Sequence, residues 1–236
     1  MAAVGCEADL HDALAEVSRE MGFSYFALTH HLDMRNAPQP AIRLHNYPGG
    51  WEDYFEEQEL GRSDPVHRAS QLTTVGFAWS KLPGMIQLTR RDRIVLEEAG
   101  TRGIGDGFTV PAHVPGEVNG SCSFATRAGA PLRPENLASA QLVGAFAFEA
   151  ARGLAKMRDR GLAQLPQLTD RQRDCVVWAS RGKTDWEIAR ILGVRHDTVI
   201  EHLRHARERY GVAKRTQLTV HALFDGSISF VDILRR

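Results

Sequence analysis

Apolar residues near the start of the chain repeat first with a helical period and then in short segments typical of strands. One set is spaced by four, three and four residues: Leu10, Leu14, Val17 and Met21. This spacing predicts a helix with one buried face, which ends at Gly22. Segments 23–30 and 41–47 are rich in aromatic and apolar residues and predict strands.

The middle of the chain continues with helices and a second pair of strands. A Pro-Gly-Gly turn at 48–50 introduces a helix over 51–60, which the segment 61–65 should break. The other expected elements are helices over 66–72, 89–100 and 134–158, and strands over 107–113 and 120–126. The glycine-rich segment 103–107 follows a helix and favours a turn.

The order of these elements predicts an α+β fold. Helices and antiparallel strands would form an α/β/α sandwich over residues 1–160. Segment 161–167 ends a charged stretch that contains Gly and Pro, and we interpret it as a linker. A small all-α domain is then expected over residues 168–236.

The pattern after residue 168 predicts a helix-turn-helix. Thr169 opens a helix that Gly182 would end. Thr184 and Glu187 form a Thr-x-x-Glu capping box before an apolar run, and Gly193 would end that short helix. Two helices joined by a tight turn are typical of a DNA-binding unit.

The next expected helix would enter the major groove of DNA. Its buried stripe is Val199, Leu203, Ala206 and Tyr210, again spaced by four, three and four. Arg204 faces outward, where a guanidinium can bond a guanine at two points. The other candidate DNA contacts, near helix starts or on the outward face, are Lys183, Thr184, Thr198, Ile200, Glu201 and His205.

Charge is distributed in a way that supports this division. The chain has no formal net charge, but from Leu168 onward 13 Lys and Arg residues stand against 9 Asp and Glu residues, a net charge of +4. Polyanion binding is therefore expected of the C-terminal part. The excess is modest, so strong binding to DNA would need a dimer.

Composition indicates a cytoplasmic protein. The three cysteines have no metal-ligand spacing and fit a reducing compartment. No apolar run is long enough for a membrane span, and no signal peptide is expected. No cofactor or metal is expected either.

A cluster of aromatic and acidic residues in the first part suits a small-molecule pocket. Tyr47, Trp51, Asp64 and Trp79 fall within 33 residues. Such residues combine ring packing with a few hydrogen-bonding groups. Taken singly, each has an ordinary interpretation: a Trp is more often a core residue, and an Asp before a Pro is more often a cap.

Both parts of the chain resemble the LuxR family of quorum-sensing transcriptional regulators. The C-terminal resemblance covers about 60 residues and rests on 168–174, 182–192, 198–199 and 202–203. The N-terminal resemblance, roughly over residues 5–160, rests on the Trp51-to-Asp64 spacing, the position of Trp79 and the segment 107–120.

The N-terminal resemblance implies an autoinducer-binding domain whose ligand is an N-acyl-homoserine lactone. Trp51 would donate its indole N–H to the lactone carbonyl, and Asp64 would accept the ligand amide N–H. Tyr47 would bond the acyl carbonyl with Ser123 nearby, and Trp79 would pack on the lactone ring. Without ligand, a buried Asp64 carboxylate is expected to lack a partner. The surrounding wall would include Val95, Leu96, Ala99, Ile104 and Thr109.

The C-terminal resemblance implies a homodimer on a pseudo-palindromic double-stranded DNA operator. Ile200, Glu201 and Arg204 lie where relatives contact bases. A helix over 216–224 would pair two modules across a two-fold axis.

The chain departs from the family pattern at several positions, and Ile200 and Glu201 are unlike the basic residues often found where they lie. The family's usual Tyr four residues after Trp51 is Phe55, so that side of the pocket lacks a hydroxyl. Arg195 replaces the usual Ser at the start of the recognition helix, which removes a common capping residue.

Two alternatives remain open at this stage. The same DNA reader could serve a sensor of a non-lactone small molecule, or a regulator that acts without ligand. An enzyme with a DNA-targeting module is disfavoured, because no nucleophile elbow, zinc-protease motif, P-loop or dinucleotide fingerprint occurs.

Overall fold

The computed structural model describes residues 5–31, 41–158 and 166–234. The chain divides into two compact units, the first built from α1 to α7 and the second from α8 to α12. Most of the expected linker, residues 161–167, lies outside the described residues.

A five-stranded antiparallel sheet forms the middle layer of the first unit. The strands follow the order β2-β1-β5-β4-β3. Their bounds are β1 Tyr25–His30, β2 Arg43–His45, β3 Phe77–Ala78, β4 Ile104–Ala112 and β5 Gly120–Arg127. The predicted α+β class with an antiparallel sheet is confirmed.

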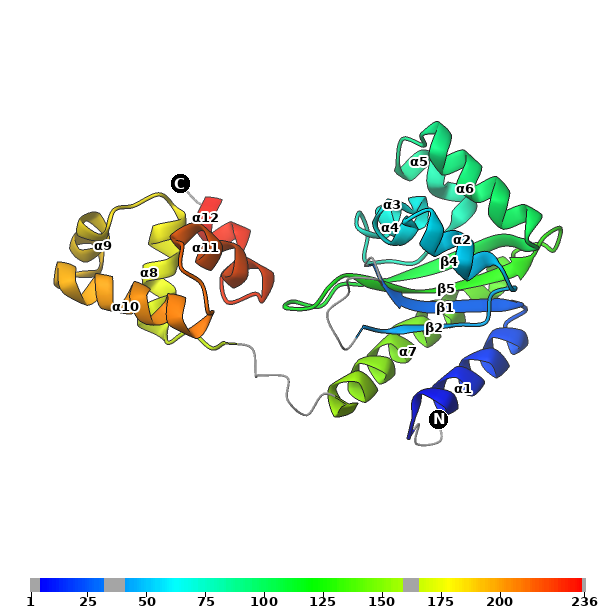
Figure 1. The fold of residues 1–236 in the computed structure, drawn as a ribbon, viewed down its shortest axis with the longest axis horizontal. Helices are drawn as coiled ribbons and strands as arrows, with labels where there is room; N and C mark the ends of the chain where they lie inside the picture. Colours follow the sequence, from blue (N-terminus) through cyan, green and yellow to red (C-terminus); the bar gives the residue numbers. More distant parts are fainter. Residues whose placement is uncertain (1–4, 32–40, 159–165, 235–236) are drawn as a thin grey trace. The chain divides into compact units, whose positions relative to one another are not determined.

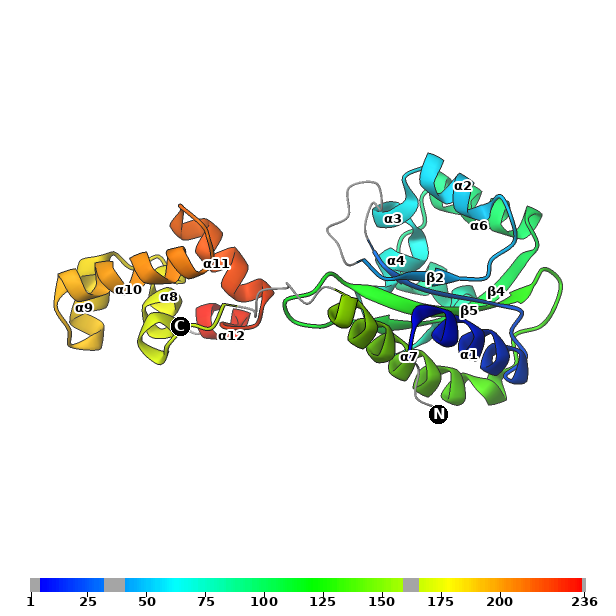
Figure 2. The same cartoon turned by 60° about the horizontal axis from the view of Figure 1, so that its bottom comes forward.

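Helices cover both faces of this sheet (Figures 1 and 2). The helices α1 Glu7–Glu20 and α7 Leu137–Arg158 lie on one face. The other face carries α2 Trp51–Glu57, α3 Leu60–Ser63, α4 Pro65–Ser70, α5 Leu82–Met85 and α6 Arg90–Thr101. Short 3₁₀ turns, η2 Trp79–Lys81 and η3 Pro134–Asn136, precede α5 and α7.

The main core lies between the sheet and the α1–α7 layer. Side chains alternate between the two faces of a strand, and on β1 Phe26 and Leu28 are fully buried against α1 and α7. Ala27 and Thr29 therefore face the opposite layer of shorter helices.

Two local expectations between residues 51 and 65 are wrong. The helix expected over 51–60 ends at Glu57, and the segment 61–65, expected to break it, instead begins inside a helical turn, α3. Glu59 adopts the left-handed conformation at φ 52°, which a helix cannot continue through. The break therefore comes at residues 58 and 59, two to three residues before the segment that the sequence indicated.

Within the glycine-rich segment 103–107, only Gly103 belongs to the expected turn, and the other four residues belong to a strand. After Gly103 the chain enters β4 at Ile104, with an irregular register between Ile104 and Gly107. A Cβ on Gly105 would lie 2.4 Å from the carbonyl oxygen of Arg127 on β5. Glycine at this position permits the close approach of the two backbones and an irregularity in the strand. A glycine-rich sequence is equally typical of a turn, so the sequence alone does not separate the two structures.

The second unit is a bundle of five helices in the described residues. They are α8 Asp170–Ser180, α9 Asp185–Leu192, α10 His196–Arg209, α11 Arg215–Phe224 and α12 Phe230–Leu234. Val199, Leu203 and Ala206 are buried in its core as the spacing predicted, while Tyr210 is half-buried at the end of α10. The helix α12 was not expected from the sequence.

Gly120→Ala is expected to destabilise the first unit. A Cβ at Gly120 would lie 2.5 Å from the Phe148 ring and 2.7 Å from the Thr29 carbonyl oxygen. Because the backbone oxygen cannot yield cheaply, we expect a loss of about 1–3 kcal/mol in the free energy of unfolding. Urea denaturation of the full chain measures this loss.

The control is Gly153→Ala in α7, where a Cβ meets nothing within 4 Å. This variant should be neutral or stabilising by up to about 1 kcal/mol. Equal unfolding midpoints for the two variants would contradict the packing argument.

Candidate functional site

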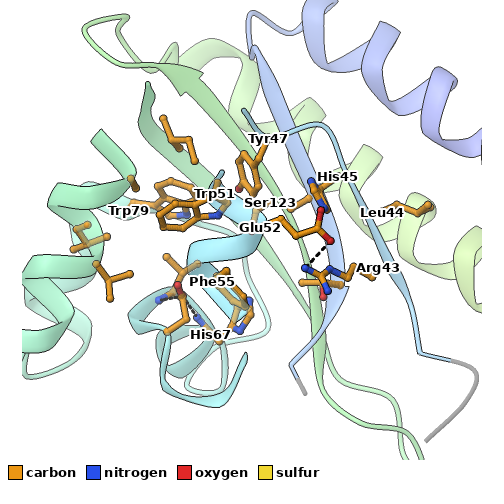
Figure 3. Close-up of a pocket in the computed structure, with 18 residues that line it drawn as sticks. Arg43, Leu44, His45, Tyr47, Trp51, Glu52, Phe55, His67, Trp79 and Ser123 are labelled. Carbon is orange, nitrogen blue, oxygen red and sulfur yellow. Dashed lines mark hydrogen bonds and ion pairs between the residues drawn. The ribbon is translucent and has the colours of Figure 1, made fainter. Parts of the chain in front are cut away.

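A cavity lies between the sheet and the layer of short helices in the first unit (Figure 3). Its cavity volume is about 90 Å³, within about 760 Å³ of space that no protein atom fills and that includes open solvent. Ten of the eleven candidate ligand residues line it: Tyr47, Trp51, Phe55, Asp64, Trp79, Val95, Leu96, Ala99, Ile104 and Ser123. The structure thus gathers these residues from β2 through β5 around one space.

The eleventh residue, Thr109, does not line the cavity. It is fully buried on β4, where its Oγ1 accepts a hydrogen bond of 2.8 Å from Trp79 Nε1 and lies 2.8 Å from Ser123 Oγ. If Thr109 donates its own proton to Ser123, the Ser123 proton is left for an acceptor in the cavity. Thr109 therefore fixes the orientation of the Trp79 indole from outside the cavity lining.

Asp64 is both a helix cap and a cavity residue. Its Oδ1 accepts hydrogen bonds from the backbone N–H groups of Val66 (2.7 Å) and His67 (3.0 Å) at the start of α4. In the described part of the chain, Oδ2 has no hydrogen-bond partner. The expectation that the unliganded carboxylate lacks any partner is wrong, because the helix start already holds one oxygen.

Tyr47 and Trp51 bring two polar groups to the cavity lining. No hydrogen bond joins the Tyr47 hydroxyl or Trp51 Nε1 to another described residue. Burial, together with the nearby Asp64 carboxylate, raises the pKa of the Tyr47 hydroxyl well above its ordinary value. The hydroxyl therefore remains protonated and available as a donor at physiological pH.

Sequence reasoning missed eight lining residues: Ala27, Thr29, Arg43, Leu44, His45, Glu52, Val66 and His67. A usable signal existed for four of them. The alternation of a strand places Arg43 and His45 on the same face as Tyr47, and it groups Ala27 with Thr29. The positions of Glu52, Val66 and His67 depend on tertiary packing.

The helix-turn-helix of the second unit is held by capping boxes. Thr184 Oγ1 accepts from the Glu187 N–H at 3.3 Å, and the Thr184 N–H donates to Glu187 Oε2 at 2.8 Å. Gly193 ends α9 in the left-handed conformation at φ 66°. The predicted capping box and its terminating glycine are confirmed.

The outward face of α10 carries candidate base contacts that are exposed. Ile200, Glu201, Arg204 and His205 are exposed, and Thr198 lies half-buried in the first turn. Arg204 donates to Glu201 at 2.6 Å and to Glu208 at 2.5 Å. A guanine contact would have to replace these local ion pairs.

Two candidate phosphate contacts are also engaged locally. Lys183 Nζ lies 3.2 Å from Glu187 Oε1, and the Thr184 hydroxyl serves as the cap of α9. Arg195 stands at the N-cap of α10 without a side-chain capping bond, as expected from its replacement of Ser.

Comparison with known families decides the identity of both units. Residues 7–151 match the autoinducer binding domain, and residues 166–222 match the bacterial regulatory proteins of the luxR family. The chain belongs to the LuxR family. It is a DNA-binding transcriptional regulator of quorum sensing, with a helix-turn-helix, and is not an enzyme.

Several LuxR-type regulators are similar along most of their length. The quorum-sensing-dependent regulator RpaR of Rhodopseudomonas palustris is 31% identical over 199 residues, which cover 84% of this chain and 79% of RpaR. The activator AhyR of Aeromonas hydrophila is 27% identical, with 91% and 85% covered. Among solved structures, Escherichia coli SdiA has a TM-score of 0.63 at 21% identity, with 93% of this chain and 90% of SdiA covered.

SdiA in complex with octanoyl-rac-glycerol gives a TM-score of 0.65 at 21% identity, with 94% of this chain and 89% of that chain covered. At this identity the likeness shows a common fold.

Within the described residues, no helix is both long and apolar enough to cross a membrane.

Thr109→Val is expected to weaken the first unit although Thr109 does not reach the cavity. The change leaves Trp79 Nε1 without its acceptor, and an unsatisfied buried donor costs about 1–3 kcal/mol. Urea denaturation followed by tryptophan fluorescence measures the loss. Thr109→Ser, which keeps the hydroxyl, should lose less than half as much; equal losses for both variants would assign the effect to the methyl group.

Proposed function

We propose that this regulator binds an N-acyl-homoserine lactone in the cavity of its first unit. One observation carries the proposal: three residues that line one side of the cavity have polar side-chain atoms without partners among the described residues. These groups are the Tyr47 hydroxyl, Trp51 Nε1 and Asp64 Oδ2. Two donors and one anionic acceptor match a ligand with two carbonyls and one amide N–H.

Each group has a role consistent with its position. Trp51 donates to the lactone carbonyl, Asp64 accepts the amide N–H, and Tyr47 donates to the acyl carbonyl with Ser123 nearby. Trp79, fixed through Thr109, offers its ring to the lactone. Phe55 lines the cavity without a hydroxyl, so this wall contacts the acyl group only through apolar surface.

The proposed mechanism couples the ligand to DNA through stability. A ligand that binds only the folded first unit stabilises it by RT ln(1 + [L]/Kd). The protein then binds a pseudo-palindromic operator as a homodimer, with α10 in the major groove and α11 at the two-fold axis.

A ligand without an amide is the second candidate, and one observation favours it. SdiA, with the same fold, has been solved in complex with octanoyl-rac-glycerol. Asp64 Oδ2 is an acceptor that a ligand hydroxyl would satisfy as well as an amide N–H.

A lactone is expected to raise the melting temperature of the full chain. At a ligand concentration of 100 times Kd, binding adds about 2.7 kcal/mol, which corresponds to a rise of roughly 5–10 °C for a domain of this size. Differential scanning fluorimetry with a panel of lactones and with octanoyl glycerol measures it. If no lactone moves the midpoint, the lactone assignment fails.

Asp64→Asn separates the two candidate ligands in the same assay. An Asn keeps an oxygen for the α4 cap but places an N–H₂ group where Oδ2 would accept the hydrogen bond of the ligand. Loss of a charge-assisted bond is worth about 1.5–3 kcal/mol, or about 10- to 100-fold in lactone affinity. The variant should melt near wild type without ligand, and octanoyl glycerol should lose less because its hydroxyl accepts as well as donates.

Arg204→Ala is expected to relax operator specificity at one base pair. A bidentate guanine contact is worth about 1–3 kcal/mol of discrimination. Fluorescence anisotropy with an operator and single-base variants measures it. Lys183→Ala is the control, because a phosphate contact weakens all sequences alike. Equal losses on all sequences for Arg204→Ala would assign Arg204 to the phosphates.

A further inference from the structure

The cavity extends across the width of the sheet. Trp79 follows β3, at one edge of the strand order, and Arg43 and His45 lie on β2, at the other edge. Neighbouring strands lie about 4.8 Å apart, so the two edges are separated by roughly 19 Å at the backbone. In Figure 3 the indoles of Trp79 and Trp51 lie on one side of the cavity and Arg43 and His45 on the other.

The end of the cavity at β2 is polar. Register pairs Arg43 with Thr29 and His45 with Ala27 on β1, and all four residues line the cavity. Glu52 reaches this end from α2: its Oε1 lies 2.9 Å from Arg43 Nη2 and its Oε2 lies 3.3 Å from His45 Nε2. We name Arg43, His45 and Glu52 the β2 end.

The β2 end offers hydrogen-bond acceptors rather than an unmatched positive charge. Arg43 is held by two carboxylates, those of Glu52 and Glu56. Burial lowers the pKa of His45, against the opposing effect of Glu52, so the ring is mostly neutral at pH 7. Among the described residues, His45 Nδ1 is buried without a hydrogen-bond partner, and the Glu52 side chain, which lines the cavity, is about half exposed.

A plain alkyl tail suits this end poorly. It would remove water from the Arg43–Glu52 ion pair and return no hydrogen bond, and buried polar groups without compensation are costly. A carboxylate tail would be placed beside Glu52 while Arg43 is already occupied. A neutral donor group would bond the Glu52 carboxylate and keep the ion pair intact.

We propose that the natural ligand carries a hydroxyl-type donor at the far end of its acyl group, and that Glu52 accepts it. This inference rests on the proposed function: the head of the ligand occupies the Trp51–Asp64 side, so its tail meets the β2 end. Glu52 is thereby a specificity-determining residue for the tail.

The test compares two matched ligands on the full chain by isothermal titration calorimetry. They are N-octanoyl-L-homoserine lactone and N-(8-hydroxyoctanoyl)-L-homoserine lactone, with the hexanoyl pair as a shorter series. The hydroxylated ligand of at least one pair should bind wild type about tenfold tighter, since bonds to an ionised acceptor are among the stronger ones. In Glu52→Gln this preference should fall to about threefold or less.

Glu56→Gln is the matched control. Glu56 also binds Arg43 but is not part of the cavity lining, so its substitution should leave the tenfold preference in place. Binding of the unmodified lactones shows that each variant is folded.

Three outcomes overturn the inference. They are equal affinities for both members of each pair in wild type, a preference that survives in Glu52→Gln, and an equal loss of preference in Glu56→Gln. In each of these cases the lactone still binds and the proposed function stands. If no lactone binds at all, the proposed function fails and the inference falls with it.

Discussion

The alternation of side chains along antiparallel strands is the constraint on which the first unit depends. On β1, Phe26 and Leu28 are buried against α1 and α7. Ala27 and Thr29, which alternate with them along the strand, face the cavity on the other side of the sheet. A shift of one residue in the register would exchange these sets and place two large apolar side chains in the cavity. The main core and the cavity thus lie on opposite faces of the same sheet.

Much of this arrangement follows from local patterns in the sequence. The period of Leu10 and Leu14 gives α1, and the capping boxes at Thr169 and Thr184 fix the starts of α8 and α9. These signals are reliable because the physical cause lies within four residues of the element it determines. The second unit, which is made of such helices, was therefore predicted almost completely, apart from α12.

The failures occur where a distant contact outweighs the local pattern. The segment 103–107 has the composition of a turn, yet pairing with β5 makes a strand of it from Ile104 onward. Gly105 and Gly107 are needed there because the backbone of β5 comes within contact distance. The cavity shows the same limit. Arg43 could be found from the alternation of its strand, which places it on the same face as Tyr47. Glu52 and His67 come from helices, and no local pattern in the sequence indicates how these helices pack on the sheet.

The polar groups of the cavity differ in how firmly the fold holds them. Asp64 is fixed by two backbone N–H groups, and Trp79 is fixed by Thr109, so neither loses much freedom when a ligand binds. Tyr47 and Trp51 pack as rings, with centroids 6.4 Å apart, but their polar atoms have no such bonds among the described residues. The folded protein therefore holds the Asp64 carboxylate in place in advance, while under the proposed function the two donors would gain partners only when a ligand binds. Under the proposed function, the Asp64 carboxylate would determine which head group is accepted, and the two donors would supply the stabilisation that links an occupied cavity to a folded first unit.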